Sequence, residues 1–506
     1  MFELPELLDV VLSLLSIQDL ARCTLVNKQW YDATIPHLWH TTLPLWPAPW
    51  SKSSFQEIVL GDYMQAQSHQ EHPWPKQDLF KSGVNAGRKV PAYQSSLSKY
   101  GPWIRNLYRP QSLFKELKST KTMPGQKELL SHFLKHCVGA RVLTLDIDWD
   151  ERDRFNCLHK VVADSIAPNL RELRLCVSSS SIMNSRWCLY IMSQCSSRLE
   201  KLVIWNAEES YHLGHIDTDK LTVATGTLCG LKELVVDHCW YKEDASSCDW
   251  FWRSCGNVKR LELGKGWKNV RTDVSLDPLA CAALLKHCGT LETVQVTNIS
   301  KSSSSTLRHI LSSSPRLQAM TTTDDRWYYQ RQFPFLKAKD FVDMRHDSGI
   351  LTPWASLKVL KTKITCIPRP DVTELLDGRQ RIGFSPESQI QHVQQRVYER
   401  LARFINLEEL FLGHGTMDYQ YECLEMTLES GLAQLKRLKN LGVLDVQMMA
   451  QRIGLKEVQW MTQNWPKLQV IQGLHDDGDN FKAAEWLWKH SPMITVKVSS
   501  RASIAR

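Results

Sequence analysis

Apolar residues recur in one arrangement over most of the chain, from about residue 129 onward. A stretch with helical spacing is followed by a short turn and then by the pattern Leu-x-x-Leu-x-Leu, with other apolar residues in some copies. Alternate side chains of a strand point to opposite faces, so the last two apolar positions share one face. We therefore expect a strand at each of 140–145, 170–175, 199–204, 231–236, 258–263, 291–296, 317–322, 357–360, 407–412, 441–446 and 468–471.

The copies are regularly spaced. The first seven begin 26 to 33 residues apart, at or just above the range of roughly 20 to 29 residues for leucine-rich repeats. Helical stretches precede the strands most clearly at 128–136, 279–287 and 397–404. Stacked units of this kind form a parallel sheet on a concave face, with helices on the convex face. The pattern predicts an α/β leucine-rich-repeat solenoid and disfavours a plain alternating α/β domain. It resembles the irregular cytosolic repeats, although the usual asparagine after each strand is mostly missing.

The first forty or so residues follow a different pattern. Six apolar residues recur at helical spacing over more than half of the helix circumference: Leu7, Leu8, Val11, Leu12, Leu14 and Leu15. Pro5 suits a first helical position, Ser16 begins a capping box for a second helix, and Asn27 can cap a third. A unit of about 45 residues cannot bury this much apolar surface alone. We expect a partner or the rest of the chain to cover it.

This N-terminal segment resembles the F-box motif. The resemblance rests on Leu4-Pro5, Leu7-Leu8, Val11-Leu12, Leu15, Asp19-Leu20, Val26, Trp30 and Leu38-Trp39. In that family the three-helix segment docks on the Skp adaptor, which holds it on a cullin scaffold. The resemblance implies an adaptor-binding surface, open to the partner, that consists of Leu4, Pro5, Leu8, Leu12, Leu15 and Leu20. Trp30 and Trp39 would instead hold the segment together. The alternative is a helical cap that seals the end of the following domain.

We predict three parts in the chain. Residues 1–45 are the F-box-like helical segment, 46–127 are a linker, and 128–506 are the irregular leucine-rich-repeat solenoid. Prolines at 47 and 49 and the aperiodic polar residues of 65–102 favour a partly mobile loop. A short strand within 100–107 would begin the next domain. Longer gaps between strand copies predict insertions near 323–356 and 363–396, and insertions often lie beside a binding face.

The residue between the last two apolar positions of each strand should point to the concave face. Thr144, Arg174, Val203, Val235, Glu262, Gln295, Thr321, Lys361, Phe411 and Asp445 form this row. Its mixed charges favour a protein partner over a uniform phosphate-binding stripe. Trp side chains anchor protein interfaces, and several lie just beyond the strands. The predicted target-binding residues are Arg174, Trp205, His238, Trp240, Glu262 and Phe411.

Composition narrows the class of protein. The 506 residues are 43% hydrophobic and 23% charged, which is ordinary for a globular chain. The net charge of +8 comes without a dense Lys/Arg block, so we expect no nucleic-acid partner. No apolar run is long enough to span a membrane, and Glu3 and Glu6 do not suit a secretory signal. We expect reduced cysteines and a cytoplasmic and/or nuclear location, without membrane association.

The sequence contains no recognisable catalytic constellation. It has no GxSxG, no phosphate-binding glycine loop, no HExxH and no dinucleotide fingerprint. His132, His136 and Cys137 come nearest to a metal cluster, but they lack a second ligand pair, so helix packing is favoured. We expect no catalytic residue, no metal and no cofactor, and therefore not an enzyme.

The sequence favours a substrate-recognition subunit of a Skp–cullin–F-box ubiquitin ligase, with repeats that bind an unknown target protein. The alternative is a leucine-rich-repeat scaffold or inhibitor outside ubiquitination. An enzyme whose site lies in the long insertions has no motif in its favour.

Overall fold

In a computed structural model the chain folds into two compact units, Met1–Leu231 and Lys232–Arg506. The residues that it describes are 5–39, 41–42, 97, 101–108, 110, 126–147, 160–177, 191–192, 194–195, 198–206, 228–236, 255–263, 288–297, 303–323, 336–342, 355–367, 387–413, 423–447, 449, 452–475 and 478–499. The loop predicted within 65–102 lies almost wholly outside these residues.

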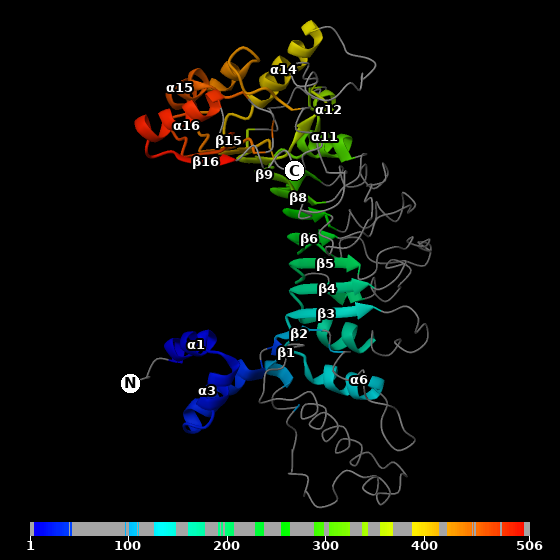
Figure 1. Ribbon diagram of the computed structural model, residues 1–506. Helices are drawn as coiled ribbons and strands as arrows, with labels where there is room; N and C mark the ends of the chain where they lie inside the picture. The colour runs from blue at the N-terminus through cyan, green and yellow to red at the C-terminus, as the bar shows by residue number, and fades with distance from the viewer. Residues whose placement is uncertain are drawn as a thin grey trace, which may run out of the picture. The chain divides into compact units, whose positions relative to one another are not determined.

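The first unit begins with three helices and continues into a parallel sheet (Figure 1). The helices are α1 (Pro5–Leu14), α2 (Ile17–Cys23) and α3 (Lys28–Trp39). The strands pair in chain order as β1 (Thr41–Thr42), β2 (Asn106–Tyr108), β3 (Val142–Ile147), β4 (Glu172–Val177) and β5 (Lys201–Asn206). Between the strands lie η1 (Gly101–Trp103), α6 (Gln126–His136), the π-helical η3 (Val162–Ile166) and η4 (Ala167–Asn169).

The second unit repeats the same arrangement over more strands. Its parallel sheet runs in the order β6 (Glu233–Val236), β7 (Arg260–Leu263), β8 (Thr293–Thr297), β9 (Ala319–Thr323), β11 (Val359–Lys361), β13 (Glu409–Phe411), β14 (Val443–Asp445), β15 (Val470–His475) and β16 (Thr495–Ser499). A separate small sheet pairs β10 (Leu336–Lys337) with β12 (Ile364–Thr365). The helical elements are η6 (Cys288–Thr290), α11 (Ser303–Ser313), α12 (Ala338–Val342), α14 (Glu387–Leu401), η8 (Leu432–Arg437), α15 (Leu455–Asn464) and α16 (Gly478–His490).

Each of the eleven predicted strand sites contains a strand, and the parallel pairing is consistent with a repeat solenoid. The short strand predicted within 100–107 is confirmed only at its end, because Gly101–Trp103 form η1 and β2 begins at Asn106. The sheet begins before residue 128, because β1 pairs with β2 and β2 pairs with β3. These first two strands are only two and three residues long, so they carry no Leu-x-x-Leu-x-Leu pattern. The last strand, β16, was not predicted because its sequence TVKVS contains no leucine.

One row of apolar side chains runs through the middle of the sheet in each unit. In the first unit the row is Leu107, Leu143, Leu173 and Leu202, and in the second it is Leu234, Leu261, Val294, Met320, Leu360, Leu410, Leu444 and Ile471. All of these are at most 1% exposed. The neighbours on either side of Leu360 are half-exposed, as alternation along a strand requires. Burying one such side chain contributes about 1.5–3 kcal/mol.

Hydrogen bonds at the start of each strand tie neighbouring repeats together. The carbonyl oxygen of Arg141 accepts the backbone N–H groups of both Arg171 and Glu172, at 2.8 and 2.9 Å. The same two-donor arrangement recurs along the second unit. Side chains of the turns add to it, because Thr290 Oγ1 donates to Val258 O and Ser356 Oγ donates to Leu317 O, each at 2.9 Å. Polar groups at the beginning of the strands thus link neighbouring repeats.

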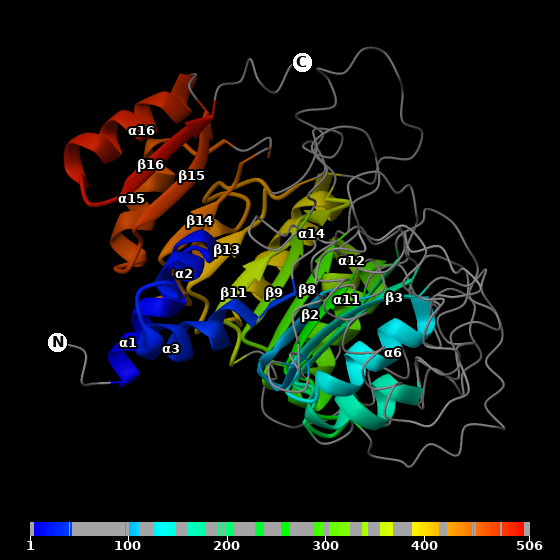
Figure 2. The same ribbon diagram turned by 90° about the horizontal axis from the view of Figure 1, so that it is seen from below.

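Part of the first predicted insertion, 323–356, belongs to the core of the second unit. Helix α12 contacts both α11 and α14 (Figure 2). Phe341 is fully buried, with its ring centroid 6.2 Å from that of Phe404. Arg400 Nη2 donates to Val342 O at 3.0 Å. Residues 336–342 of this insertion therefore pack between helices through their apolar side chains. Helix α14 likewise begins within the second predicted insertion, 363–396.

Leu261→Ala tests the buried row in the second unit. It removes a side chain that is 0% exposed, so we expect the free energy of unfolding to fall by about 2–5 kcal/mol. The neighbouring change Arg260→Ala is the control, because its exposed ion pair with Glu233 contributes at most about 1 kcal/mol. Urea denaturation of both variants gives the two values. Equal losses would contradict the assignment of Leu261 to the core.

Candidate functional site

The three N-terminal helices are set by local capping signals. Ser16 precedes α2, and its Oγ accepts the N–H of Asp19 at 3.2 Å. Asn27 precedes α3, and its Oδ1 accepts the N–H of Trp30 at 2.9 Å. Both caps were predicted from the sequence, and both satisfy a backbone donor that the first helical turn leaves free.

The helices share a small apolar core. Leu8, Leu12 and Leu20 are 6%, 1% and 5% exposed, and Leu15, Trp30, Ala33 and Leu38 pack against them. A hydrogen bond between His37 Nε2 and Asp9 Oδ1, at 2.8 Å, joins α3 to α1. The role predicted for Trp30, holding the segment together, agrees with this packing. The side chain of Trp39 is outside the described residues.

The predicted open surface is wrong for three of its six residues. Leu8, Leu12 and Leu20 face the interior of the segment, and Leu15 is half-buried. Leu4 and the side chain of Pro5 lie outside the described residues. The reason is that α1 is apolar on two sides, and the sequence alone does not say which side the other two helices cover.

The other side of α1 is exposed and apolar. Val10, Val11 and Leu14 are 56%, 39% and 80% exposed. At 100° per residue, Val10 and Leu14 lie within about 40° of each other, whereas Leu12 lies about 160° from Leu14. In the turn between α2 and α3, Leu25 and Val26 are 85% and 62% exposed. We call these five residues the outer apolar face.

This concentration is unusual within the described part of the chain. Six of the twelve exposed large apolar side chains there belong to the N-terminal helices: the five of the outer apolar face and Tyr31. A local concentration of exposed apolar side chains favours an interaction site.

The predicted row on the sheet face exists as a continuous register. In the first unit Thr144, Arg174 and Val203 are neighbours on adjacent strands. In the second unit the register joins Val235, Glu262, Gln295, Thr321, Lys361, Phe411 and Asp445. The row is therefore in the predicted place within each unit.

Its residues differ in how accessible they are. Arg174 is half-exposed, and its Nε lies 2.7 Å from Glu172 Oε1. Phe411 is half-exposed too, with Lys361 Nζ 4.1 Å from its ring centroid, a cation–π distance. Glu262 is 3% exposed, so the expectation that it is open to a target is wrong, although it lies in the same row as the half-exposed Arg174 and Phe411.

The remaining predicted target-binding residues are not placed. Trp205 belongs to β5, but its side chain is outside the described residues, as are His238 and Trp240. On the sheet face, oppositely charged side chains form ion pairs: Arg260 lies 3.5 Å from Glu233, and Lys361 lies 3.0 Å from Glu409. The described face therefore carries both signs of charge.

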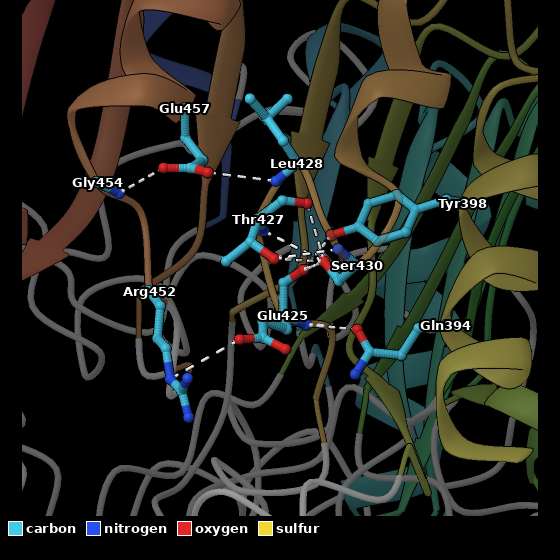
Figure 3. Close-up of polar contacts among 9 residues, drawn as sticks. All are labelled: Gln394, Tyr398, Glu425, Thr427, Leu428, Ser430, Arg452, Gly454 and Glu457. Carbon is cyan, nitrogen blue, oxygen red and sulfur yellow. Dashed lines mark hydrogen bonds and ion pairs between the residues drawn. The ribbon is translucent and has the colours of Figure 1, made fainter. Parts of the chain in front are cut away.

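A polar cluster in the second unit holds the segment 423–431 in place (Figure 3). Tyr398 Oη, on a fully buried side chain, donates to the carbonyl oxygen of Glu425 at 2.6 Å, and Ser430 Oγ also contacts that oxygen. Gly431 has φ +121°, and a Cβ there would come within 2.9 Å of the Tyr398 ring. Glycine is thus required beside the tyrosine.

The Glu457 carboxylate of the cluster also binds main-chain groups. Glu457 accepts the N–H of Leu428 at 3.3 Å and that of Gly454 at 3.0 Å, so it connects the start of α15 to the segment. Glu425 Oε1 lies 3.8 Å from Arg452 Nε. None of the nine residues drawn in Figure 3 is a histidine or cysteine, and the hydroxyls contact main-chain carbonyls. The arrangement fixes a loop, and it places no base beside a nucleophile.

The His132, His136 and Cys137 group is packed as a helix end. The two imidazole ring centroids are 4.9 Å apart, and Cys137 Sγ donates to Phe133 O at 3.3 Å. The pKa of His132 is lowered to about 4, chiefly by burial and to a smaller extent by the charges of His136 and Lys135. Burial raises the pKa of the Cys137 thiol well above its usual range. Across the described residues, no three His, Cys, Asp or Glu side chains are grouped to hold a metal ion.

Burial also keeps two other thiols protonated. It raises the pKa of Cys195 to about 12 and that of Cys255 above its usual range. Both are buried in turns before strands. In the part of the chain that is described, every helix is too short or too polar to cross a membrane.

Comparison with known proteins identifies the N-terminal helices. Residues 5–43 match the F-box-like family, and the chain therefore carries an F-box-like domain there. No curated protein matches the sequence. Among solved structures, the crystal structure of a protein from Bacteroides fragilis covers 71% of this chain and 73% of its own, with 10% identity and a TM-score of 0.27. A TM-score of this size does not establish a shared fold.

Tyr398→Phe tests the polar cluster. It removes the hydroxyl that bonds to Glu425 O inside the protein, so we expect the free energy of unfolding to fall by about 1 kcal/mol. Tyr31→Phe, at a 36% exposed position, is the matched control and should change it by less than about 0.5 kcal/mol. Chemical denaturation measures both. An unchanged free energy of unfolding in Tyr398→Phe would show that the cluster does not hold the loop.

His132→Gln tests the buried imidazole. Because the pKa of His132 falls from 6.5 to about 4 on folding, the unfolded chain binds the proton more readily between these values. Acid should therefore destabilise the protein as pH falls from about 6.5 toward 4. The variant should lose less stability than the wild type between pH 7 and pH 5, measured by urea denaturation. An identical loss in the two proteins would contradict the lowered pKa.

Proposed function

We propose that this chain is the substrate-recognition subunit of a Skp–cullin–F-box ubiquitin ligase. Its F-box-like domain at 5–43 would dock on the Skp adaptor, as F-box domains generally do. Its strand units, which we interpret as irregular leucine-rich repeats, would bind a target protein. The observation that carries the proposal is the outer apolar face, which remains exposed although the three helices have a core of their own.

The docking surface proposed here differs from the one that the motif first implied. Leu8, Leu12 and Leu20 form the core of the segment and would act by keeping the helices in place. Contact with the adaptor would fall to the outer apolar face, with Leu14 and Leu25 as its most exposed members at 80% and 85%. Burying such side chains against a partner is the main favourable term in association.

The proposed mechanism is proximity. The adaptor and cullin would hold the chain beside a ubiquitin-loaded enzyme, while the sheet face holds the target. This raises the effective concentration of the target near the activated ubiquitin. The chain itself would form and break no bonds, so we propose that it is not an enzyme. Arg174 in the first unit and Phe411 with Lys361 in the second are the half-exposed positions that we propose for target contact.

The alternative is a scaffold or inhibitor outside ubiquitination, with helices that only cap the sheet. If the helices were only a cap, their remaining apolar side chains would be buried against the strands that follow. The exposure of Val10 and Leu14, at 56% and 80%, favours docking over capping.

Leu14→Asp in the full-length chain tests adaptor docking. A carboxylate in an apolar interface is costly to desolvate, so we expect affinity for the purified Skp adaptor to fall at least tenfold, or about 1.4 kcal/mol. Isothermal titration calorimetry measures it. Gln463→Asp introduces the same charge at an exposed position of α15 and should leave affinity unchanged.

Leu12→Asp separates docking from folding. Because Leu12 is 1% exposed, this change should unfold the N-terminal helices and expose them to proteolysis, as well as abolish binding. Leu14→Asp should weaken binding at least tenfold while the helices stay resistant to protease. The proposal fails if the wild-type chain does not bind the adaptor, or if Leu14→Asp binds as well as wild type.

A further inference from the structure

The last strand of the second unit has an apolar side that its neighbours do not cover. Val496 and Val498 pair in register with Ile471 and Leu474 of β15. Ile471 and Leu474 are both 0% exposed, whereas Val496 and Val498 are half-exposed. Each inner strand is covered by a neighbour on both sides, so the difference arises because β16 is the final strand in the order of the described sheet.

Helix α16 exposes large apolar side chains beside this strand. Its inner side packs on the sheet through Ala483, Ala484 and Leu487, all 0% exposed. On its outer side Phe481 and Trp488 are 44% and 48% exposed, with ring centroids 6.3 Å apart in an edge-to-face arrangement. Met493, in the turn between α16 and β16, is 89% exposed. Terminal units of stacked proteins normally need a polar outer face to stay soluble.

The charges around these side chains are mostly positive. Lys482 and Lys489 are exposed on α16, and Lys497 is exposed in the middle of β16. Glu485 is the one acidic residue in the described part of α16 with its side chain placed. Helical geometry puts positions 482, 485 and 489 within about 100° of position 481, on the same outer side as the aromatic pair.

The free edge of a strand is itself a binding element. In the described sheet β16 pairs on one side only, with β15. Such an edge presents backbone N–H and C=O groups that accept an added strand. Along β16, Val496 and Val498 lie on one face and Lys497 lies on the other. An added strand would therefore need apolar and charged side chains in alternation.

We propose that this end of the second unit docks an acidic, extended segment of another protein, which adds as a strand beside β16. The terminal surface consists of the β16 edge, Phe481, Trp488, Met493, Lys482, Lys489 and Lys497. Apolar side chains of the partner would cover Val496, Val498 and the exposed aromatic side chains. Carboxylates at alternating positions would face Lys497, since opposite charges on adjacent strands stabilise a pair.

A second copy of this chain fits less well. Two β16 strands related by a two-fold axis and paired over their full length would place Lys497 opposite Lys497 of the second copy. Like charges directly opposite on adjacent strands are destabilising, and an edge lysine commonly prevents such pairing. The inference goes beyond the proposed ligase function and does not depend on the N-terminal helices.

A labelled peptide tests the proposal with the full-length chain. The probe is an acetylated, fluorescein-labelled decapeptide of alternating valine and glutamate, and its matched partner has lysine in place of glutamate. In fluorescence anisotropy we expect the glutamate peptide to bind at least tenfold more tightly. Lys497→Glu and Trp488→Ala should each weaken its binding at least fivefold, and hydrogen exchange in 495–499 should slow when the peptide binds.

Controls separate the terminal surface from general charge effects. Lys456→Glu, at an exposed position of α15, should leave peptide affinity unchanged, and Skp adaptor binding should be the same in Lys497→Glu as in wild type. Equal binding of the two peptides, no binding of either, or no effect of Lys497→Glu would overturn the proposal. So would sedimentation showing a dimer that Trp488→Ala dissociates, because the occupant would then be a second copy.

Discussion

Each inner strand of the parallel sheet contributes an apolar side chain to a buried row, and the strand cannot cover this side chain by itself. Leu261 reaches 0% exposure because strands on both sides supply the remaining contacts. Stacking of the units follows from this requirement, and the hydrogen bonds at the strand starts fix the spacing. The same requirement is unmet wherever stacking stops. Val496 and Val498 show this at the last strand, where both side chains are only partly buried.

The N-terminal helices meet the same requirement in another way. Three short helices cannot bury all of their apolar surface, so α1 divides it between two sides. Leu12 completes the internal core, while Leu14 stays 80% exposed. The helices therefore fold as a unit and still retain a surface that needs a partner. A subunit that acts by proximity requires this combination, because its docking surface must persist before the partner arrives.

Local patterns predicted the sheet well. Alternation and the recurring leucines are properties of a few neighbouring residues, so all eleven strand positions could be read from the sequence. The two capping residues, Ser16 and Asn27, were also predictable, because a cap acts on the next turn of its own helix. The register row on the sheet face followed directly from the strand positions.

Features decided by distant residues could not be predicted in this way. Which side of α1 faces inward depends on α2 and α3, so the motif alone misassigned Leu8, Leu12 and Leu20. The burial of Glu262 cannot be read from its row, because Arg174 and Phe411 in the same row are half-exposed. The packing of Phe341 depends on Phe404, more than sixty residues away in sequence. Strand β16 lacks leucine and is recognised as a strand only through its pairing with β15.

Hydrogen–deuterium exchange of the full-length chain, with and without the Skp adaptor, tests the central claim most directly. If the outer apolar face is the docking surface, exchange should slow in α1 and in the turn at 24–27 when the adaptor is added, with no change in β13 to β15. Absence of association, or slowing confined to the strands of the sheet, would contradict the account.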